Sequence, residues 1–321
     1  MLRRLIPDPF LLFLVATILM ATFVPARGGF AIVVGWLSIV TIVLLFFFHG
    51  AKLARDQVIA GLTHWRLHLT ILACTFLVFP LLGVIGFRAW PGLLPRDLWI
   101  GMLFLCALPS TVQSAIAFVS MARGNVPAAI ASASASQMLG ILLTPVLMGL
   151  MAGAHGGAVN LKGVSEIAAQ ILLPFVIGHL LRPWIGGWIA RHKQLIGITD
   201  RSTIIVAVYG AFSAAVLEGL WHKLPPAALA LLIGVNAVLL AIGLGFTWGL
   251  GRALGFERAD RITIQFCGTK KSLLQGVPMA KVLFPGPQTG VILLPIMLFH
   301  QMQLMACAFI ARRYANQTEA H

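Results

Sequence analysis

The sequence predicts an all-α polytopic membrane protein whose ten transmembrane helices form two inverted five-helix repeats. Three observations carry this prediction: a very apolar composition, hydrophobic runs that recur along the whole chain, and polar interruptions at matching places in the two halves. Of the 321 residues, 59% are hydrophobic and 10% are charged, and the mean hydropathy is +0.95. A soluble domain carries charge on about a quarter of its residues. The composition therefore excludes an ordinary soluble protein and favours one built for a lipid bilayer.

Hydrophobic runs of about 20 residues follow one another from end to end, and each can cross roughly 30 Å of hydrocarbon as a helix. We expect membrane spans at residues 9–24, 30–48, 68–86, 98–121, 127–151, 165–181, 202–220, 227–250, 262–281 and 290–310. An even number of crossings places both ends of the chain on the same side of the membrane.

The net charge of +14 follows this topology and does not indicate a nucleic-acid partner. Basic residues gather in short loops on alternate sides of the spans, as they do when positive charge marks the cytoplasmic side. The predicted cytoplasmic side carries Arg3, Arg4, Lys52, Arg55, Arg66, Arg123, Arg182, Arg191, Lys193, Arg201, Arg252, Arg258, Arg261, Arg312 and Arg313. The predicted outer side carries Arg27, Arg88, Arg96, Lys162, Lys223 and Lys281. We therefore expect a multi-pass protein of the cytoplasmic (inner) membrane with both termini cytoplasmic.

Motifs for nucleotide hydrolysis, metal-dependent proteolysis and serine hydrolysis are missing: the sequence has no P-loop, no HExxH and no GxSxG on a predicted strand. Cys74, Cys106, Cys267 and Cys307 lie in predicted spans, without a CxxC pair or a metal-ligand spacing with histidine. We expect no metal site, no cofactor and no enzymatic activity.

Two predicted spans are interrupted by polar residues at corresponding depths. The fourth contains LPSTVQS (108–114) and the ninth contains CGTKKS (267–272). A shift of 158 residues places Thr111 on Thr269, Ser114 on Ser272, Arg123 on Lys281 and Pro127 on Pro285. Each half then holds five spans, an odd number, so the halves enter the membrane from opposite sides. The sequence thus predicts two inverted repeats, 1–155 and 156–321, each with a broken fourth helix.

Lys270 and Lys271 stand side by side in the ninth span, within an otherwise uncharged stretch (262–280). An ammonium near the bilayer centre costs on the order of 3 kcal/mol, so two of them need water, an anion or backbone carbonyls around them. Backbone groups freed by a helix break can bind ions, and half-helix N-termini suit anions. We therefore predict a binding site at the two breaks. Two structural alternatives stay open: the lysines only lock the break by pairing with carbonyls, and Pro109 only kinks the fourth span.

Residues around the breaks are the candidate ligands. The expected substrate- or ion-binding residues are Lys270, Lys271, Thr269, Ser272, Ser110, Thr111, Gln113 and Ser114, with His300, Gln301 and Gln303 of the tenth span as further candidates. His300 is either a proton relay or a neutral imidazole that bonds a neighbouring helix.

Four segments carry a family resemblance over nearly the whole chain. They are FCGTKKSLLQGVPMA (266–280), LPSTVQSAIAFVSMARGNVPAA (108–129), LLPFVIGHLLRP (172–183) and LFHQMQLMACAFIARRYA (298–315). The chain resembles the bile acid:sodium symporter superfamily, and within it the SBF-like branch. The resemblance implies a panel domain from spans 1, 2, 6 and 7 and a core domain from spans 3, 4, 5, 8, 9 and 10. It also implies that the broken fourth and ninth helices cross, and that the protein moves organic anions.

The ninth span departs from the sodium-driven members of that superfamily. Those relatives carry a carboxylate, a glutamine and an asparagine around this break, and alignment on Gly268 puts Phe266, Lys270 and Lys271 at these places. An ammonium a few ångströms from a sodium site would repel the ion by several kcal/mol at an intermediate effective dielectric. We therefore expect Lys270 or Lys271 to occupy the cation position and to interact with the transported anion.

The fifth span adds two candidates through the same resemblance. Sodium-driven relatives draw oxygen ligands from this region, which suggests Ser136 and Gln137 as further ligands. Close packing of small residues against the broken helices is the alternative explanation of the Ala/Ser pattern there.

The preferred function is secondary active transport of a small organic anion by alternating access. A desolvated lysine beside a second cation can exchange a proton, so we expect transport to be proton-linked or sodium-independent. The alternatives are a sodium-coupled, bile-acid-like symporter, a non-transporting membrane regulator of ion homeostasis, and an enzyme that uses Lys270 as nucleophile or base but lacks the usual accompanying groups. The expected partners are the anion and membrane lipid. The sequence leaves open the substrate, the choice between H⁺ and Na⁺, and the oligomeric state.

Overall fold

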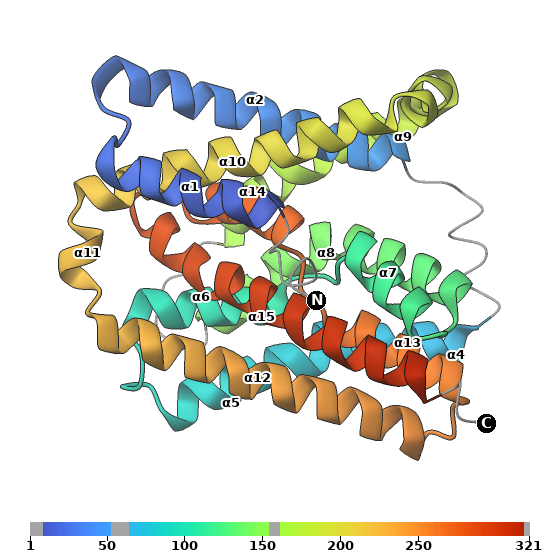
Figure 1. Ribbon diagram of the computed structural model, residues 1–321. Helices are drawn as coiled ribbons and strands as arrows, with labels where there is room; N and C mark the ends of the chain where they lie inside the picture. Colours follow the sequence, from blue (N-terminus) through green and yellow to red (C-terminus); the bar gives the residue numbers. More distant parts are fainter. Residues whose placement is uncertain (1–8, 53–63, 154–160, 318–321) are drawn as a thin grey trace. The chain divides into compact units, whose positions relative to one another are not determined.

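The computed structural model describes residues 9–52, 64–153 and 161–317, and all regular secondary structure within these ranges is helical (Figure 1). In chain order the elements are α1 (Pro9–Phe23), α2 (Gly28–Lys52), α4 (Trp65–Ala73), the π-helical segment η2 (Cys74–Val78), α5 (Phe79–Ala89), α6 (Arg96–Ala107), α7 (Gln113–Met121), α8 (Val126–Gly153), α9 (Leu161–Arg191), α10 (Lys193–Leu217), α11 (Leu220–Lys223), α12 (Pro226–Ala253), α13 (Arg258–Thr269), α14 (Leu273–Leu283) and α15 (Gln288–Asn316). The predicted all-α class is confirmed.

Within the described residues, seven helices are long and apolar enough to cross a membrane. They are Gly28–Lys52, Trp65–Ala89, Val126–Met151, Ile171–Arg191, Gln194–Leu217, Pro226–Ala253 and Gln288–Asn316. The part Leu12–Phe23 of α1 is a shorter apolar helix. The protein is an integral, multi-pass membrane protein.

Pairs of shorter helices replace one continuous helix at the predicted fourth and ninth spans. Residues 108–112 separate α6 from α7, and residues 270–272 separate α13 from α14. The first break begins where a residue that precedes proline is driven out of the helical region: Leu108, before Pro109, is extended at φ −70° and ψ 149°. After the second break, the Ser272 hydroxyl accepts a hydrogen bond from the Gln275 N–H (3.3 Å) and so caps the first turn of α14.

The sixth span is longer than predicted, and this boundary is corrected. The sequence predicts a span that ends at residue 181, whereas α9 continues through Pro183 to Arg191. Proline is tolerated inside membrane helices because neighbouring groups can satisfy the backbone groups that it frees. The predicted positions of the two termini, of Arg3, Arg4 and Arg55, and of the boundary between the repeats fall outside the described residues.

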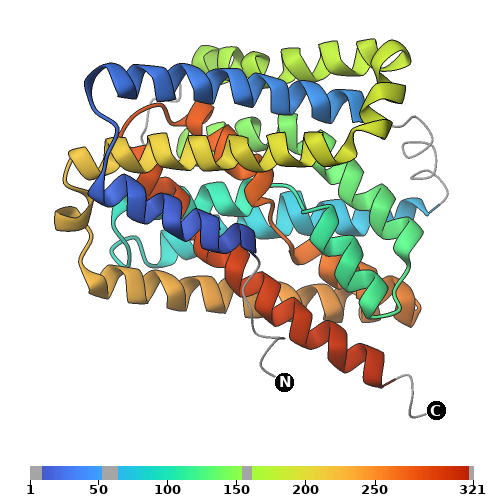
Figure 2. The same cartoon turned by 45° about the horizontal axis from the view of Figure 1, so that its top comes forward.

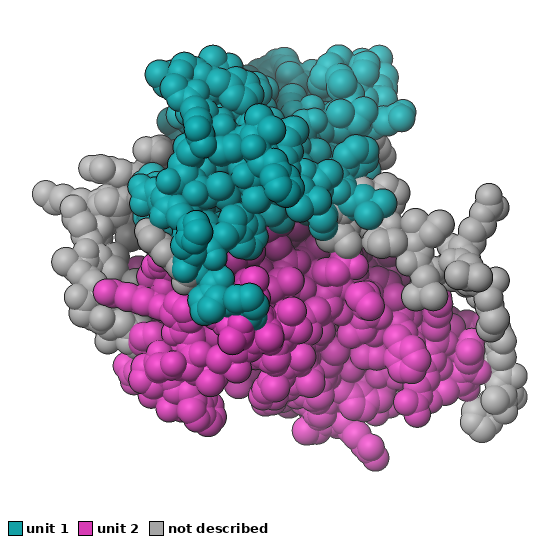
Figure 3. All heavy atoms as spheres, turned by 60° about the vertical axis from the view of Figure 1, so that its left-hand side comes forward, with its two compact units in different colours: residues 1–53, 165–226, 276–293 teal, residues 54–164, 227–275, 294–321 magenta. Residues whose placement is uncertain are grey.

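The chain divides into two compact units, which Figure 3 shows in different colours. Unit 1 comprises Met1–Leu53, Ser165–Pro226 and Gly276–Leu293. Unit 2 comprises Ala54–Val164, Ala227–Gln275 and Leu294–His321.

In unit 1, α10 packs along both α1 and α2 (Figure 2). The helices α2 and α9 approach closely through two glycines. A Cβ atom on Gly50 would overlap the backbone of Phe175, and one on Gly178 would overlap the backbone of Phe47. Small residues of this kind allow the backbones of membrane helices to pack against each other.

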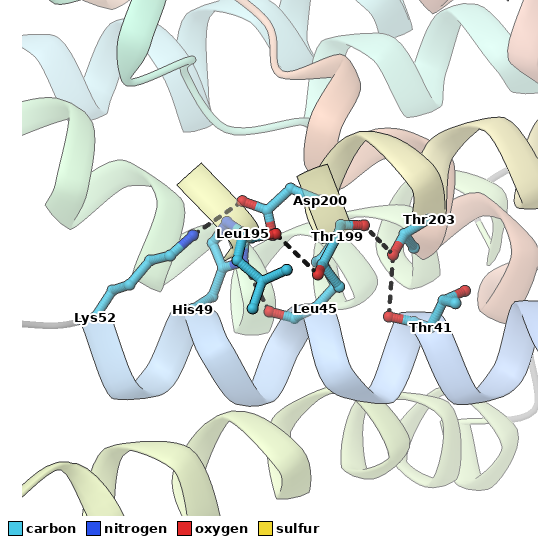
Figure 4. A network of polar contacts seen from close by, with 8 residues as sticks. All are labelled: Thr41, Leu45, His49, Lys52, Leu195, Thr199, Asp200 and Thr203. Carbon is cyan, nitrogen blue, oxygen red and sulfur yellow. Dashed lines mark hydrogen bonds and ion pairs between the residues drawn. The ribbon is translucent and has the colours of Figure 1, made fainter. Parts of the chain in front are cut away.

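Polar contacts join α2 to α10 in the same unit (Figure 4). Lys52 Nζ donates to Asp200 Oδ2 at 2.9 Å, and Thr203 Oγ1 donates to the Thr41 carbonyl at 3.2 Å. Asp200 is buried, so the ammonium of Lys52 neutralises a carboxylate that would otherwise be isolated in an apolar setting. This pair was not anticipated from the sequence.

In unit 2, α8 presents a row of small residues at a spacing of four, Ser132, Ser136, Gly140 and Thr144, which lie on one face of the helix. Gly140 makes room for Pro109, because a Cβ there would come within 2.6 Å of the Cβ and Cγ of the proline ring. Thr144 Oγ1 donates to the carbonyl of Ala107, the last residue of α6, at 2.9 Å. This face of α8 therefore supports the first helix break.

Candidate functional site

The two helix breaks meet inside unit 2. The Ser272 N–H donates to the Pro109 carbonyl at 2.8 Å, so the two interrupted backbones are hydrogen-bonded to each other. Both are extended at the end of their first helix, Leu108 after α6 and Lys270 after α13. The breaks predicted at 108–114 and 267–272 are thus present, and they are adjacent in space.

The Lys271 ammonium is enclosed by backbone carbonyls. Its Nζ donates to the carbonyls of Cys106 (2.8 Å), Leu108 (2.9 Å) and Thr75 (3.0 Å), and it lies 4.4 Å from the ring centroid of Phe79. A lysine ammonium has three N–H donors, and all three are used here. The end of α6 leaves carbonyls without helical partners, and the ammonium satisfies two of them. Lys271 therefore occupies its site as a bound cation would.

Gln303 of α15 holds the peptide groups of Lys271 in place. Its side-chain oxygen accepts from the Lys271 N–H and its amide nitrogen donates to the Lys271 carbonyl, each at 2.9 Å. The same amide nitrogen lies 3.0 Å from Nδ1 of His300. Gln303 and His300 are thus brought to the second break, as proposed from the sequence, while the buried Oε1 of Gln301 has no partner among the described residues.

Lys270 is buried in a different environment from its neighbour. Its Nζ donates to Ser114 Oγ at 3.2 Å and lies 4.3 Å from the ring centroid of Phe118. Ser114 Oγ in turn lies 2.8 Å from Thr111 Oγ1. The side chain is 0% exposed, and two of its three N–H donors have no hydrogen-bond partner in the part of the chain that the structure describes. Lys270 is therefore the ammonium with capacity for a further ligand.

Ser114 lies in the first turn of α7, so the hydroxyl that Lys270 contacts stands at the N-terminal end of a half-helix. Such an end carries partial positive charge from its unpaired N–H groups. A buried ammonium, two hydroxyls and a helix N-terminus form an arrangement suited to a carboxylate, sulfonate or similar anion.

The other predicted ligands take part in helix packing. Ser136 Oγ accepts from the Ser110 N–H at 3.0 Å. Thr269 Oγ1 lies 3.0 Å from Thr247 Oγ1 of α12. Gln137 contributes its backbone carbonyl, which accepts from Gln275 Nε2 at 3.2 Å. These contacts fix the positions of the helices around the breaks.

Gln113 stands apart from the group, because its side chain is exposed at the start of α7.

Within the described residues, no group of three or more histidine, cysteine or acidic side chains could hold a metal ion.

Several residues at this site were missed by reasoning from the sequence. The carbonyls of Thr75 and Cys106 carry no side-chain signal, so nothing in the sequence pointed to them. Gln275 lies in the segment that carries the family resemblance. It is a polar residue about one helical turn after the two lysines, and this position could have identified it as a candidate for the site. His68 was also missed; its Nδ1 lies 2.6 Å from Ser132 Oγ.

Comparison with known proteins places the chain in a family. The model of the SBF-like CPA transporter family matches residues 8–316. The chain is 53% identical to the protein PA2026 of Pseudomonas aeruginosa over 317 residues, which cover 98% of this chain and 95% of that protein. It is also 53% identical to YfeH of Escherichia coli K12, which is named a symporter, over 97% of this chain and 94% of YfeH.

A more distant relative is sodium/bile acid cotransporter 7 of Rattus norvegicus, which is 29% identical over 84% of this chain and 80% of the relative. The names of the family, of YfeH and of sodium/bile acid cotransporter 7 describe transport and no enzymatic reaction. With a family match over almost its whole length, the chain belongs to the SBF-like CPA transporter family, which is a family of membrane transporters and not of enzymes.

Proposed function

We propose that this protein is a secondary transporter that moves a small organic anion across the cytoplasmic membrane, with Lys270 as the residue that binds the anion. The observation that carries the proposal is a fully buried ammonium that makes one hydrogen bond to a side-chain hydroxyl and none to a carboxylate among the described residues. A charge in this position is expensive unless a ligand or water completes its coordination. An organic anion supplies the missing negative charge and the missing acceptors.

Lys271 has a different role in this proposal: it positions the break and does not bind substrate. Its three donors are already used by backbone carbonyls. Those carbonyls are the kind of oxygen ligands that an alkali cation would need, and the ammonium holds them. A sodium ion placed nearby would be repelled by several kcal/mol at an intermediate dielectric. The arrangement supports transport that is proton-linked or independent of sodium.

The proposed architecture is ten spans in two inverted five-helix repeats (1–155 and 156–321), with the broken fourth and ninth helices crossing. Seven long helices, the shorter α1 and two broken pairs are consistent with ten crossings. The proposed panel domain (spans 1, 2, 6 and 7) corresponds to α1, α2, α9 and α10. These helices lie in unit 1 except for the start of α9 before Ser165, and unit 1 also includes Gly276–Leu293. Transport would then proceed by motion of the core domain relative to the panel domain.

The proposed location is the cytoplasmic (inner) membrane with both termini cytoplasmic. The alternation of basic loops along the sequence and the similarity to YfeH of Escherichia coli support it.

A sodium-coupled symporter is the second candidate. Among the buried side-chain oxygens of unit 2 that have no hydrogen-bond partner in the described residues are Ser110 Oγ, in the first break, and Gln275 Oε1, in the first turn of α14. Neutral oxygens of this kind can bind sodium. The name of sodium/bile acid cotransporter 7 favours the same candidate.

Uptake into proteoliposomes tests the proposal. The probes are labelled taurocholate, benzoate and succinate, three organic anions of different size, and protein-free liposomes are the control. We expect the wild type to take up at least one probe when a pH gradient is imposed, without a requirement for sodium. Lys270→Met should abolish uptake, because the anion loses its counter-charge.

Unchanged uptake by Lys270→Met would remove that residue from the binding site. Full sodium-dependent uptake by the double variant Lys270→Met/Lys271→Met would overturn the proposal in favour of the sodium-coupled candidate. Failure of the wild type to move any of the three anions would count against organic-anion transport.

A further inference from the structure

We propose that His68 is a proton-binding site through which protons reach and leave Lys270, along a row of hydroxyl groups inside unit 2. This inference rests on the proposed function, because it assigns a route to the proton that the transport cycle would exchange.

His68 stands where exposed and buried parts of α4 meet. The preceding residues His64, Trp65 and Arg66 are exposed, whereas the His68 side chain is 7% exposed. Its Nδ1 lies 2.6 Å from Ser132 Oγ of α8, and Ser132 is 0% exposed. A histidine is the side chain whose charge changes most readily near neutral pH. His68 is therefore a titratable group, near the start of a membrane-spanning helix, that contacts a buried hydroxyl.

The hydroxyl row continues from Ser132 towards the first helix break. Ser136 follows one helical turn later on the same face of α8. The Cβ atoms of residues four apart on a helix lie about 6 Å from each other, so the proposed route needs a water molecule between the two hydroxyls. Ser136 Oγ accepts from the Ser110 N–H at 3.0 Å, and Ser110 Oγ is buried without a partner among the described residues.

The last part of the row reaches the ammonium. Thr111, the next residue after Ser110, places its Oγ1 2.8 Å from Ser114 Oγ, and Ser114 Oγ accepts from Lys270 Nζ at 3.2 Å. The row thus ends at the amine that binds the anion in the proposed function, and the present inference assigns to this amine the proton of a proton-linked cycle.

The orientation of the two α8 serines distinguishes them from ordinary membrane hydroxyls. Serine and threonine in helices commonly donate back to the carbonyl four residues earlier. In unit 2, Thr75 does this with Ile71 (2.9 Å) and Thr247 with Gly243 (2.7 Å). Ser132 and Ser136 instead bond groups outside their own helix, His68 and the Ser110 N–H. Their hydroxyls therefore lie along the path between His68 and the break.

The transfer step exchanges only N–H and O–H bonds. A proton from solvent binds His68 Nε2 while the Nδ1 proton passes to the Ser132 oxygen, which releases its own proton to the next oxygen. Bridging waters carry the proton across the gaps between hydroxyls. At the end of the row, the Ser114 hydroxyl gives its proton to the neutral amine of Lys270 and receives one from Thr111. Release of the proton follows the same bonds in reverse.

Charged groups near His68 come from the elements packed against α4. The helix α13 carries Asp260, Arg258, Arg261 and the thiol of Cys267, and Asp260 Oδ1 accepts from Asn125 Nδ2 at 2.8 Å. The helix α8 contributes no titratable group and η2 contributes only Cys74. On α4 and its cap, Arg66 donates to the Leu254 carbonyl (3.4 Å), and His64 is exposed. No charged side chain in the described residues lies between His68 and Lys270 on the row itself.

A pH jump on the purified full-length protein in detergent tests the route without any substrate. Proton release after a jump from about pH 6 to about pH 9 is followed with an indicator dye. We expect the wild type to show a kinetic phase that disappears in Lys270→Met. His68→Asn keeps a side-chain donor near Ser132 but cannot titrate, and it should slow that phase about tenfold or more. The matched control is His64→Asn, which removes an exposed histidine of the same segment and should leave the phase unchanged.

Three results would overturn the route: a wild type without a phase that depends on Lys270, an unchanged phase in His68→Asn, and equal slowing in His64→Asn. If His68→Asn does not fold, Ser132→Ala replaces it, because it removes the next oxygen and should slow the same phase. An unchanged phase in a folded Ser132→Ala protein would also overturn the route.

Transport separates this inference from the proposed function. In proteoliposomes, His68→Asn should lose accumulation driven by a pH gradient and keep exchange of the same labelled anion at equal pH on both sides. Loss of both activities would indicate a structural role for His68 and overturn the route. Absence of uptake by the wild type would instead count against the proposed function, while the pH jump still decides the proton route.

Discussion

At the scale of single residues, two adjacent lysines of identical chemistry have different environments. The backbone at Lys270 is extended, so successive side chains point to opposite sides. Lys271 is directed to three carbonyls from η2 and the end of α6, and Lys270 to Ser114 and Phe118 of α7. The first lysine has capacity for a ligand and the second has none. The sequence left open two alternatives, an ammonium for binding and an ammonium that locks the break, and the proposed function assigns the first to Lys270 and the second to Lys271.

Lys271→Met should destabilise the protein more than Lys270→Met does. Removal of the Lys271 ammonium leaves three buried carbonyls without a donor, and each buried polar group left unpaired costs about 1–3 kcal/mol. Lys270→Met removes one hydrogen bond to a hydroxyl that keeps its bond to Thr111. Thermal unfolding in detergent measures the difference. A Lys271→Met protein with the midpoint of the wild type, or with a smaller decrease than Lys270→Met, would contradict the assignment.

At the scale of elements, the broken helices depend on a continuous neighbour. The helix α8 follows the first break, with Gly140 against the Pro109 ring and Thr144 bonded to the last residue of α6. An interrupted pair of short helices has few backbone hydrogen bonds of its own across the break, so its geometry must come from such contacts. The small residues on this face of α8 therefore position the candidate site, even where they supply no ligand.

Gly140→Ala should destabilise the protein by about 1–3 kcal/mol, the usual effect of overpacking. The added methyl would come within 2.6 Å of two ring carbons of Pro109, and a proline ring cannot rotate away. Gly245→Ala on α12 is the matched control, because a Cβ there meets no atom within 4 Å. The control should be neutral or slightly stabilising, since alanine favours helix over glycine. Equal unfolding midpoints for the two variants would contradict the prediction, because they would show that the helices shift to accept the added methyl group beside Pro109 without loss of stability.

At the scale of the whole molecule, the two units differ in how their buried charged side chains are paired. Unit 1 pairs Lys52 with the buried Asp200, and unit 2 holds the two buried lysines without a buried carboxylate among its described residues. A transported anion would therefore bring negative charge to unit 2, where the described interior has none. A sodium ion would add to an existing excess of positive charge.

Replacement of potassium chloride by sodium chloride at constant ionic strength should leave the thermal unfolding midpoint of the wild type unchanged. A bound ion stabilises a folded protein by about 2.7 kcal/mol when its concentration is a hundred times its dissociation constant. A midpoint that rises specifically with sodium would contradict the proposed cation role of Lys271 and support sodium binding near Ser110 and Gln275. The same titration on Lys271→Met shows whether removal of the ammonium creates a sodium site.

Much of the fold could be predicted because the signals are local. Apolar runs report membrane spans directly, since the bilayer leaves helices as the structure that satisfies every backbone group within one segment. The first break was predictable because Pro109 disfavours a helical conformation at Leu108. The extension of α9 through Pro183 was not, because neighbouring helices decide whether a proline ends a membrane helix.

The candidate site could be predicted only in outline. The sequence alone determined that this is a helical membrane protein with two polar interruptions and two lysines at one of them, because hydropathy, proline and charge act at the position where they occur. The tertiary structure decided which lysine is satisfied, and it brought His68 to Ser132 and Gln303 to Lys271. The physical reason is distance along the chain: Lys271 and the Thr75 carbonyl are separated by 196 residues, and no pattern within one segment specifies a contact that folding makes between segments so far apart.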